Sequence, residues 1–327
     1  MDSRANPAGM VPWLFGTLAV AALIGAVMHF AEFERVAEIA RRAQPLWLIV
    51  AVLLQTSTYA SIALSWRAVL RRARTPQPLR RLFPLAVAKL FADQVIPSAG
   101  MGGNLLLVDR LTALGVRRGT AIATLLVSLV GYYAAYAFLA ILMLFALWVD
   151  SEARPLLVGA VTTFLLVALA IPALALWLRR RGSRPLSPRL ESLRPVRMLI
   201  EAFSEAPDEL VSDLRLLFSV TGFNALVFLA DAATLTACLC ALGQPATPGT
   251  AFIALMMASI VATLAPIPMG LGSFEATSTA MLAMLGVHVE AALAATLLLR
   301  MLTLWLPLIP GLMLLHRQSR RSKRVQG

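Results

Sequence analysis

The chain has 327 residues, of which 59% are hydrophobic and 14% are charged, and its mean hydropathy is +0.78. This composition excludes an ordinary soluble globular protein and is typical of a protein that crosses a membrane several times. The net charge of +12 does not indicate nucleic-acid binding, because the basic residues cluster beside apolar segments instead of forming a stripe on a soluble fold. We therefore predict a single integral membrane domain over 1–327.

Six apolar segments are long enough to cross a bilayer, which takes about 20 helical residues. They are 11–30, 45–66, 119–149, 155–178, 214–241 and 291–316. No small-residue cleavage site follows the first segment, so we expect it to be a retained anchor. The predicted fold class is an all-α polytopic membrane protein.

Two further apolar segments, about 82–108 and 250–286, are each interrupted by a stretch rich in proline and glycine. The stretches read Pro-Ser-Ala-Gly-Met-Gly-Gly-Asn over 97–104 and Pro-Ile-Pro-Met-Gly-Leu-Gly-Ser over 266–273. Backbone groups freed by such residues cannot face lipid and must be buried in protein or line a wet cavity. We predict a re-entrant helical hairpin at each stretch. The predicted turn residues are Pro97, Gly100, Gly102, Gly103, Pro266, Pro268, Gly270 and Gly272.

The basic residues indicate the orientation of the chain. With a cytoplasmic N-terminus, the inside segments carry 23 lysines and arginines and the outside segments carry 4, as the positive-inside rule requires. If the interrupted segments crossed the membrane fully, 67–81 and 109–118 would lie on opposite faces and break this rule. We therefore favour re-entrant hairpins and cytoplasmic termini, and we expect anionic lipid headgroups to contact the cytoplasmic basic loops.

The segments that follow the two stretches also resemble each other. Residues 115–127 and 286–298 share five of thirteen positions at a constant offset. Because three crossings separate the hairpins, the second hairpin is expected to enter from the opposite face. We predict an inverted repeat, an arrangement that points to a transport site near the bilayer midplane. The predicted parts are repeat 1 (about 45–149), a cytoplasmic amphipathic linker (179–213), repeat 2 (about 214–316) and a basic tail (317–327).

Polar side chains inside the apolar segments are candidates for substrate binding, because a central charge costs about 2.5–3.5 kcal/mol unless it has a partner or a wet cavity. The candidates are Lys89, Asp93, Asn104, Asn224, Asp231, Glu275 and Arg300. Lys89 and Asp93 are spaced to pair along one helix face, and the alternative is that this pair only stabilises the hairpin. Arg300 needs Asp231 or Glu275 as a partner. We expect Glu275, with a purely structural lock as the alternative.

No catalytic motif is readable in the sequence. The three histidines lie near the ends of predicted spans, and Cys238 and Cys240 fit packing roles better than a metal site. We therefore predict no enzyme activity, no metal and no cofactor. Transport by such a chain would use an ion gradient or run downhill.

At 97–103 and 266–276 the chain resembles the transmembrane flippase domain of lysylphosphatidylglycerol synthases, a family that includes stand-alone, hopanoid-associated membrane proteins. The family's second motif reads Pro-x-Pro-Gly-Gly-Leu-Gly-x-x-Glu-Ala, and here Met269 replaces its first glycine. The Trp66-Arg67 pair fits as well, whereas Asn104 stands where many members carry an acidic residue. The resemblance covers about 10–316.

The resemblance implies that the chain moves a lipid between the leaflets of the bacterial inner membrane. Bifunctional members carry a soluble aminoacyl-transferase domain after the membrane part. Since this chain ends at Gly327, we expect it to move a lipid made by another protein. The family's substrates are phospholipids with an added amino acid, polyprenyl-linked sugars and hopanoids, and nothing in the sequence selects among them. The alternatives are a small-solute or ion permease and, less favoured, an intramembrane enzyme that modifies lipid headgroups.

Overall fold

The computed structural model describes residues 43–95, 101–149, 155–181, 206–245, 247–265 and 270–306. The chain divides into two compact units, Met1–Ala43 and Gln44–Gly327, and every helix described below belongs to the second unit. The expected span 11–30, the basic tail 317–327 and most of the linker 179–213 lie outside the described residues.

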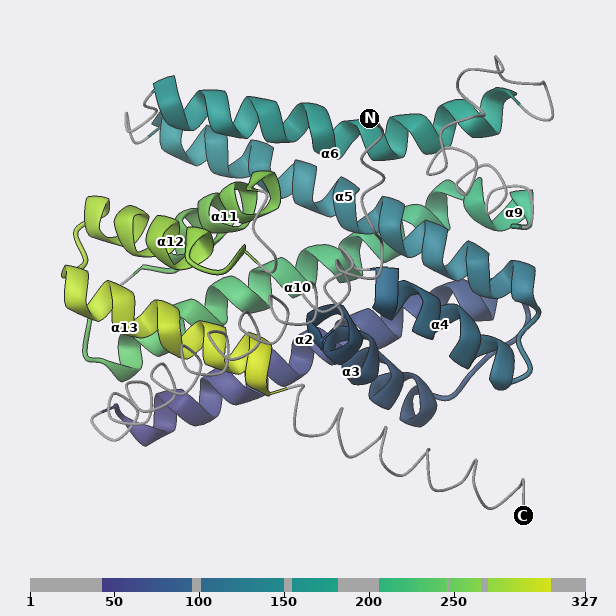
Figure 1. The fold of residues 1–327 in the computed structure, drawn as a ribbon, viewed down its shortest axis with the longest axis horizontal. Coiled ribbons are helices and arrows are strands. Elements are labelled where there is room, and N and C mark those ends of the chain that lie inside the picture. Colours follow the sequence, from purple (N-terminus) through teal and green to yellow (C-terminus); the bar gives the residue numbers. More distant parts are fainter. Residues whose placement is uncertain are drawn as a thin grey trace, which may run out of the picture. The chain divides into compact units, whose positions relative to one another are not determined.

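All regular elements in the described part of the chain are helices (Figure 1). In chain order they are α2 (Pro45–Arg72), α3 (Leu79–Val95), α4 (Met101–Ala113), α5 (Arg118–Val149), α6 (Pro155–Arg181), α9 (Asp208–Val211), α10 (Leu214–Ala241), α11 (Pro248–Leu264), α12 (Ser273–Met284), α13 (Val289–Arg300) and the π-helix η3 (Met301–Trp305).

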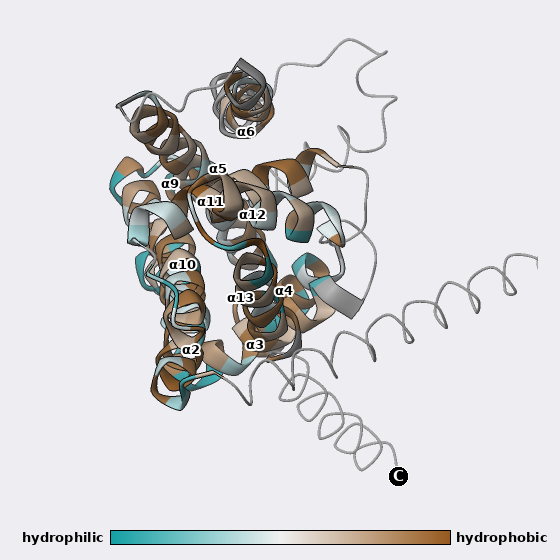
Figure 2. Ribbon diagram, turned by 90° about the vertical axis from the view of Figure 1, so that its left-hand side faces the viewer, coloured by the Kyte–Doolittle hydropathy of each residue, from teal (hydrophilic) through white to brown (hydrophobic). Residues whose placement is uncertain are grey.

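Three of these helices, α2, α5 and α10, are long and apolar enough to cross a membrane. Figure 2 shows that the helices are mostly hydrophobic along their length. Large apolar side chains remain exposed on α5, among them Phe138, Phe145 and Trp148. Such exposure is explained by contact with lipid, because in water it would favour aggregation. The full number of crossings stays a prediction.

Helices α2 and α10 are both 28 residues long and run antiparallel. At one end of the pair, the N–H of Gln44 donates to the carbonyl oxygen of Ala241 at 2.8 Å. At the other end, Arg72 Nε donates to Asp213 Oδ2 at 2.5 Å. Because each bond joins the start of one helix to the end of the other, the two helices stay in register along their contact.

Helices α3 and α4 pack together as a helical hairpin, and α11 and α12 form a second one. In the first hairpin, Gln77 Nε2 donates to the carbonyl oxygen of Leu114 at 3.4 Å. The residues just before α3 therefore lie beside the residues just after α4. Hairpin α3–α4 follows the C-terminal end of α2, and hairpin α11–α12 follows the C-terminal end of α10. Since α2 and α10 are antiparallel, the two hairpins start from opposite ends of this pair.

The first hairpin packs on α2 through an apolar core. Trp66 of α2 is 1% exposed and belongs to the same buried cluster as Leu82 of α3 and Leu107 and Leu111 of α4. Burial of these side chains fixes the hairpin against the long helix and so determines where its polar residues lie.

The order α2–α3–α4–α5 corresponds to the order α10–α11–α12–α13. Corresponding helices in the two series end with the same kind of turn. A residue with positive φ follows α2 (Arg74, 57°) and α10 (Gly243, 70°), and likewise α4 (Gly115, 84°) and α12 (Gly286, 91°). In all four cases the N–H of the next residue donates to the carbonyl oxygen five residues back, at 2.9–3.1 Å. These are helix C-caps of the Schellman type. The two halves therefore share turns as well as sequence, and their inversion in the membrane stays a prediction.

Arg74 has a positive φ at a position where the second half of the chain has a glycine, and this difference predicts an effect on stability. We expect Arg74→Gly to stabilise the protein by about 1 kcal/mol, because glycine adopts a positive φ without steric cost. We expect Gly243→Ala to destabilise it by about 1 kcal/mol for the same reason. A Cβ at Gly243 meets no atom within 4 Å, so the backbone alone would account for the change. Thermal unfolding of the purified protein in detergent measures both, and an unchanged Gly243→Ala variant would contradict the prediction.

Candidate functional site

Glu275 and Arg300 form an ion pair at the second hairpin. Arg300 Nε donates to Glu275 Oε1 at 2.6 Å, and the N–H of Gly272 donates to Glu275 Oε2 at 2.7 Å. The two side chains are only 14% and 13% exposed. The Arg300 guanidinium also lies over the ring of Phe274, 4.9 Å from its centroid, a favourable cation–π distance. Of the two carboxylates expected from the sequence, Glu275 is therefore the partner of Arg300.

The local backbone explains why Glu275 points to this position. Gly272 has a φ of 82° and is the N-cap of α12, which places Glu275 in the first helical turn. A carboxylate is stabilised there by the helix dipole and by the N–H groups that the helix leaves unpaired. Arg300 ends α13 at the point where the π-helix η3 begins. Single π-turns within helices occur frequently at functional sites.

Lys89 and Asp93 form a second ion pair, inside the first hairpin. Lys89 Nζ donates to Asp93 Oδ2 at 2.6 Å, and both side chains are 21% exposed. The N–H of Gly103 donates to Asp93 Oδ1 at 3.1 Å, so Asp93 joins α3 to the start of α4. A Cβ at Gly103 would overlap the Asp93 carboxylate and lie 2.7 Å from the Lys89 carbonyl oxygen. Only glycine fits this contact.

The two hairpins thus contain the same arrangement of groups. In each, one carboxylate oxygen accepts from a cation, and the other accepts from a glycine N–H at the start of the second half-helix. Of the 29 lysines and arginines in the sequence, three lie within the predicted membrane segments: Lys89, Arg300 and Arg215, the last of which is in the first turn of α10. A mostly buried cation needs such a carboxylate, because its desolvation would otherwise be uncompensated.

The other candidates are not joined to these pairs by any hydrogen bond or ion pair within the described residues. Asn224 is 7% exposed, and its Nδ2 donates to the carbonyl oxygen of Val220 at 2.9 Å, within its own helix. Asn104 is partly exposed on α4. Asp231 has one oxygen, Oδ1, that is buried without a partner, and the side chain of Gln55 approaches its carboxylate from α2.

The predicted turn residues are described only in part. Gly270 and Gly272 have φ values of 63° and 82°, as tight turns with glycine require. At Gly270 a Cβ would lie 2.6 Å from the Cβ of Ala262, so the turn also packs closely on α11. Gly102 and Gly103 lie in the first turn of α4. Four turn residues lie outside the described part of the chain: Pro97, Gly100, Pro266 and Pro268.

Sequence reasoning missed two groups of buried polar residues. Gln55 and Tyr59 of α2 are each 4% exposed. Gln55 is an isolated amide in an apolar span, which is the same signal that identified Asn224. Ser278 of α12 and Thr296 of α13 share a buried hydroxyl hydrogen bond of 2.9 Å. Single hydroxyl residues give no such signal, because most of them bond to their own helix.

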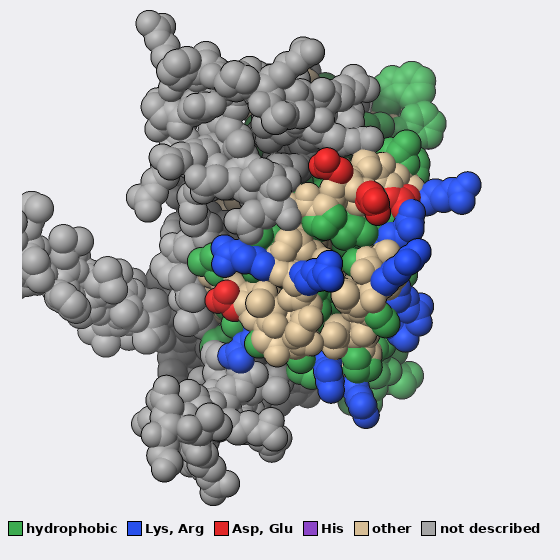
Figure 3. Space-filling model, turned by 90° about the vertical axis from the view of Figure 1, so that its right-hand side faces the viewer, with side chains coloured by type: hydrophobic (Ala, Val, Ile, Leu, Met, Phe, Trp, Pro, Cys, Tyr) green, Lys and Arg blue, Asp and Glu red, His purple; other side chains and the backbone are tan. Residues whose placement is uncertain are grey.

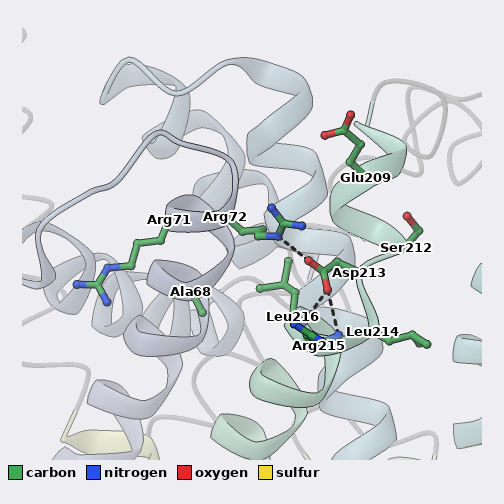
Figure 4. Close-up of a pocket in the computed structure, with 9 residues that line it drawn as sticks. All are labelled: Ala68, Arg71, Arg72, Glu209, Ser212, Asp213, Leu214, Arg215 and Leu216. Carbon is green, nitrogen blue, oxygen red and sulfur yellow. Dashed lines mark hydrogen bonds and ion pairs between the residues drawn. The ribbon is translucent and has the colours of Figure 1, made fainter.

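A pocket of about 970 Å³ lies at the end of the α2–α10 pair where Arg72 meets Asp213 (Figure 4). Its lining residues are Ala68, Arg71, Arg72, Glu209, Ser212, Asp213, Leu214, Arg215 and Leu216. Figure 3 shows lysine and arginine side chains gathered on this end of the described residues. None of the seven candidate substrate-binding residues lines the pocket, so it is separate from both ion pairs.

Asp213 has several partners at this end. Its Oδ1 accepts from the N–H groups of Arg215 and Leu216 at 3.0 and 3.2 Å, which caps α10. The hydrogen bond from Arg72, followed by those from the backbone, holds the pKa of the Asp213 carboxyl below its usual range.

These observations define the class of protein first: an all-helical membrane protein with a carboxylate–cation pair in each of two helical hairpins. The chain belongs to the family described as the lysylphosphatidylglycerol synthase TM region, which it matches over residues 13–311. No curated protein matches the chain. The family relates this membrane protein to the handling of lipids. Within the described residues, no group of three or more His, Cys, Asp or Glu side chains is placed to hold a metal ion.

The Asp213 contacts predict a pH dependence of stability. A carboxyl with a lowered pKa in the folded state stabilises the protein fully above its unfolded pKa, and this contribution is lost as the pH falls through the folded value. We expect Asp213→Asn to be less stable than wild type near neutral pH, and the difference to shrink as the pH falls below about 4. Asparagine can still cap α10, so the variant isolates the charge. Melting temperatures measured across this pH range would contradict the prediction if the difference stayed constant.

The Gly103 contact predicts a second stability effect. We expect Gly103→Ala to lower the free energy of unfolding by about 1–3 kcal/mol, because the added methyl group separates α4 from Asp93. Gly222→Ala on α10 is the matched control, since a Cβ there meets no atom within 4 Å. We expect this control to be neutral or slightly stabilising. Equal stability of the two variants in denaturant titrations would refute the close contact at Gly103.

Proposed function

We propose that this protein is a lipid flippase of the bacterial inner membrane, which moves a lipid with a polar headgroup between the leaflets or out of the membrane. The observation that carries the proposal is the pair of similar ion pairs, Lys89–Asp93 and Glu275–Arg300, one in each hairpin of a lipid-related membrane family. Ionisable residues within membrane segments are rare because they are costly, so their presence favours a role in binding or translocation.

The arrangement of the hairpins supports passage through the membrane. They start from opposite ends of the antiparallel α2–α10 pair. If α2 and α10 span the bilayer, the two hairpins enter it from opposite faces as re-entrant segments. Lys89 then belongs to the hairpin that enters from one face, and Arg300 is paired with the hairpin that enters from the other. A headgroup that leaves the cation of one hairpin can then be received by the cation of the other.

The chemistry of the pairs suits an anionic headgroup such as a phosphate. The Lys89 ammonium has three N–H donors, of which one is directed to Asp93. A phosphate oxygen can therefore join this pair or replace the carboxylate. Because the cation is already largely removed from water, this exchange avoids most of the desolvation cost of binding. The acyl chains can remain in the surrounding lipid, so only the headgroup needs a polar path.

The basic end of the molecule supports recruitment of the same lipids. The pocket beside Arg72 and Asp213 also has Arg71 and Arg215 in its lining. Basic residues near a membrane surface attract anionic lipids by about 1 kcal/mol each. We propose that this end faces the cytoplasm and that the lipid is moved without chemical change, with phospholipids, aminoacylated lipids, polyprenyl-linked lipids and hopanoids as the candidate substrates.

Reconstitution of the full-length protein in liposomes tests the proposal. We expect the wild type to transfer fluorescent phosphatidylglycerol between leaflets, as measured by quenching of the outer leaflet. We expect Glu275→Gln and Arg300→Ala each to reduce the rate at least about tenfold, because each variant removes one charge of the proposed site and leaves the other uncompensated. Asp109→Asn, which removes an exposed carboxylate from α4, is the control and should keep the wild-type rate.

The same experiment separates the proposal from its alternatives. Wild-type rates in folded Glu275→Gln or Arg300→Ala protein would remove that residue from the transport site. Loss of folding in both variants would favour a structural lock. Release of an encapsulated small solute without lipid transfer would indicate a permease, and a change in the mass of the lipid would indicate an enzyme.

A further inference from the structure

A cluster of polar side chains lies between α2 and α10. Within the described residues, no hydrogen bond or ion pair joins it to Lys89–Asp93 or to Glu275–Arg300. We call Gln55, Tyr59 and Asp231 the Asp231 cluster. Three of its atoms, Gln55 Oε1, Tyr59 OH and Asp231 Oδ1, are buried without a hydrogen-bond partner in the described part of the chain. Buried polar atoms in native proteins are nearly always bonded, so three such atoms in one cluster point to a ligand.

The register of the two long helices brings these residues together. Gln55 lies eleven residues after Gln44, and Ala230 lies eleven residues before Ala241, the partner of Gln44. Gln55 therefore lies opposite Ala230 and next to Asp231, where its side chain approaches the carboxylate. Tyr59, one helical turn further along α2, also lies within electrostatic range of Asp231.

No cation neutralises Asp231 in the described structure. The ionisable groups in its range from the helices that pack on α10 are Tyr59 of α2 and Tyr132 of α5. Helix α11 has no ionisable residue, and α13 has only Glu290 and Arg300, near its two ends. Arg300 is bonded to Glu275, and no ion pair joins it to Asp231. The ring of Tyr132 also packs on Phe228, three residues before Asp231 on α10.

The smallest ligand that satisfies this cluster is a proton. Neither Gln55 Oε1 nor Asp231 Oδ1 carries a hydrogen, so both can only accept. Protonation of Asp231 removes a charge that would be costly in a membrane and provides one O–H donor for these acceptors. Of the three cluster residues, Asp231 is partly exposed, so the cluster is not fully enclosed by the helix pair.

We propose that Asp231 is a proton-binding site and that its proton is exchanged during lipid transfer. The proton is taken from water at one face of the membrane onto a carboxylate oxygen and is released to water at the other face, so no other reactant is consumed. The coupling to lipid movement rests on the proposed function. The binding of the proton does not.

Infrared spectroscopy of the purified full-length protein tests proton binding without any transport. We expect a carbonyl stretching band of a protonated carboxylic acid that appears and disappears with pH. The band should be lost in Asp231→Asn and kept in Asp109→Asn. Its absence from the wild type at every pH at which the protein stays folded would overturn the proposal, as would an unchanged band in Asp231→Asn. If Asp231→Asn does not fold, Asp231→Glu should shift the band, and an unshifted band would assign it to another residue.

Liposomes that contain the same protein test the coupling, with fluorescent phosphatidylglycerol as the probe. One coupled proton biases the distribution of the probe between the leaflets about tenfold for each unit of imposed pH gradient. We expect this response in wild type and Asp109→Asn, and its loss in Asp231→Asn. Probe transfer that ignores the pH gradient, or that follows a sodium gradient instead, would overturn the coupling. If the wild type moves no probe, the proposed function fails, and the infrared result still decides the proton site.

Discussion

The antiparallel pairing of α2 and α10 is the constraint on which the rest of the structure depends. The pair is closed at one end by the Gln44–Ala241 hydrogen bond and at the other by the Arg72–Asp213 ion pair. Because each long helix leads into one hairpin, the direction of the pair determines that the hairpins start from opposite ends. The same register places Gln55 beside Asp231. The pairing of α2 and α10 therefore determines both the position of the hairpins and the position of the buried polar cluster.

The charged residues of the two hairpins are stabilised by their own hydrogen bonds and ion pairs. Asp93 and Glu275 each accept from a cation and from a glycine N–H, so each carboxylate is bonded on both oxygens. These contacts neutralise the cations and also tie a turn to its neighbouring helix. A charge arranged in this way stabilises the hairpin, because its cost of burial is offset by these bonds. Asp231 differs, because no cation of the described residues forms an ion pair with it.

Some features could be predicted from the sequence because they depend on local chemistry. The apolar segments 45–66, 119–149 and 214–241 correspond to helices that are long and apolar enough to span a membrane. The Lys89–Asp93 pair follows from the helical spacing of two opposite charges. The motif at 266–276 pointed to the family before any geometry was known, and the chain matches that family over residues 13–311.

The sequence by itself determined the helical membrane class, the family and the charged residues inside the apolar segments, because hydropathy and turn chemistry act over short stretches of chain. Only the tertiary structure decided which of these residues meet. Glu275 and Arg300 are 25 positions apart, and Gln55 and Asp231 are further apart still, so their contacts depend on helix packing and register. The C-cap shared by α2 and α10 was equally hidden, because Arg74 stands where the second half has Gly243. Backbone geometry can be the same in two repeats whose side chains differ.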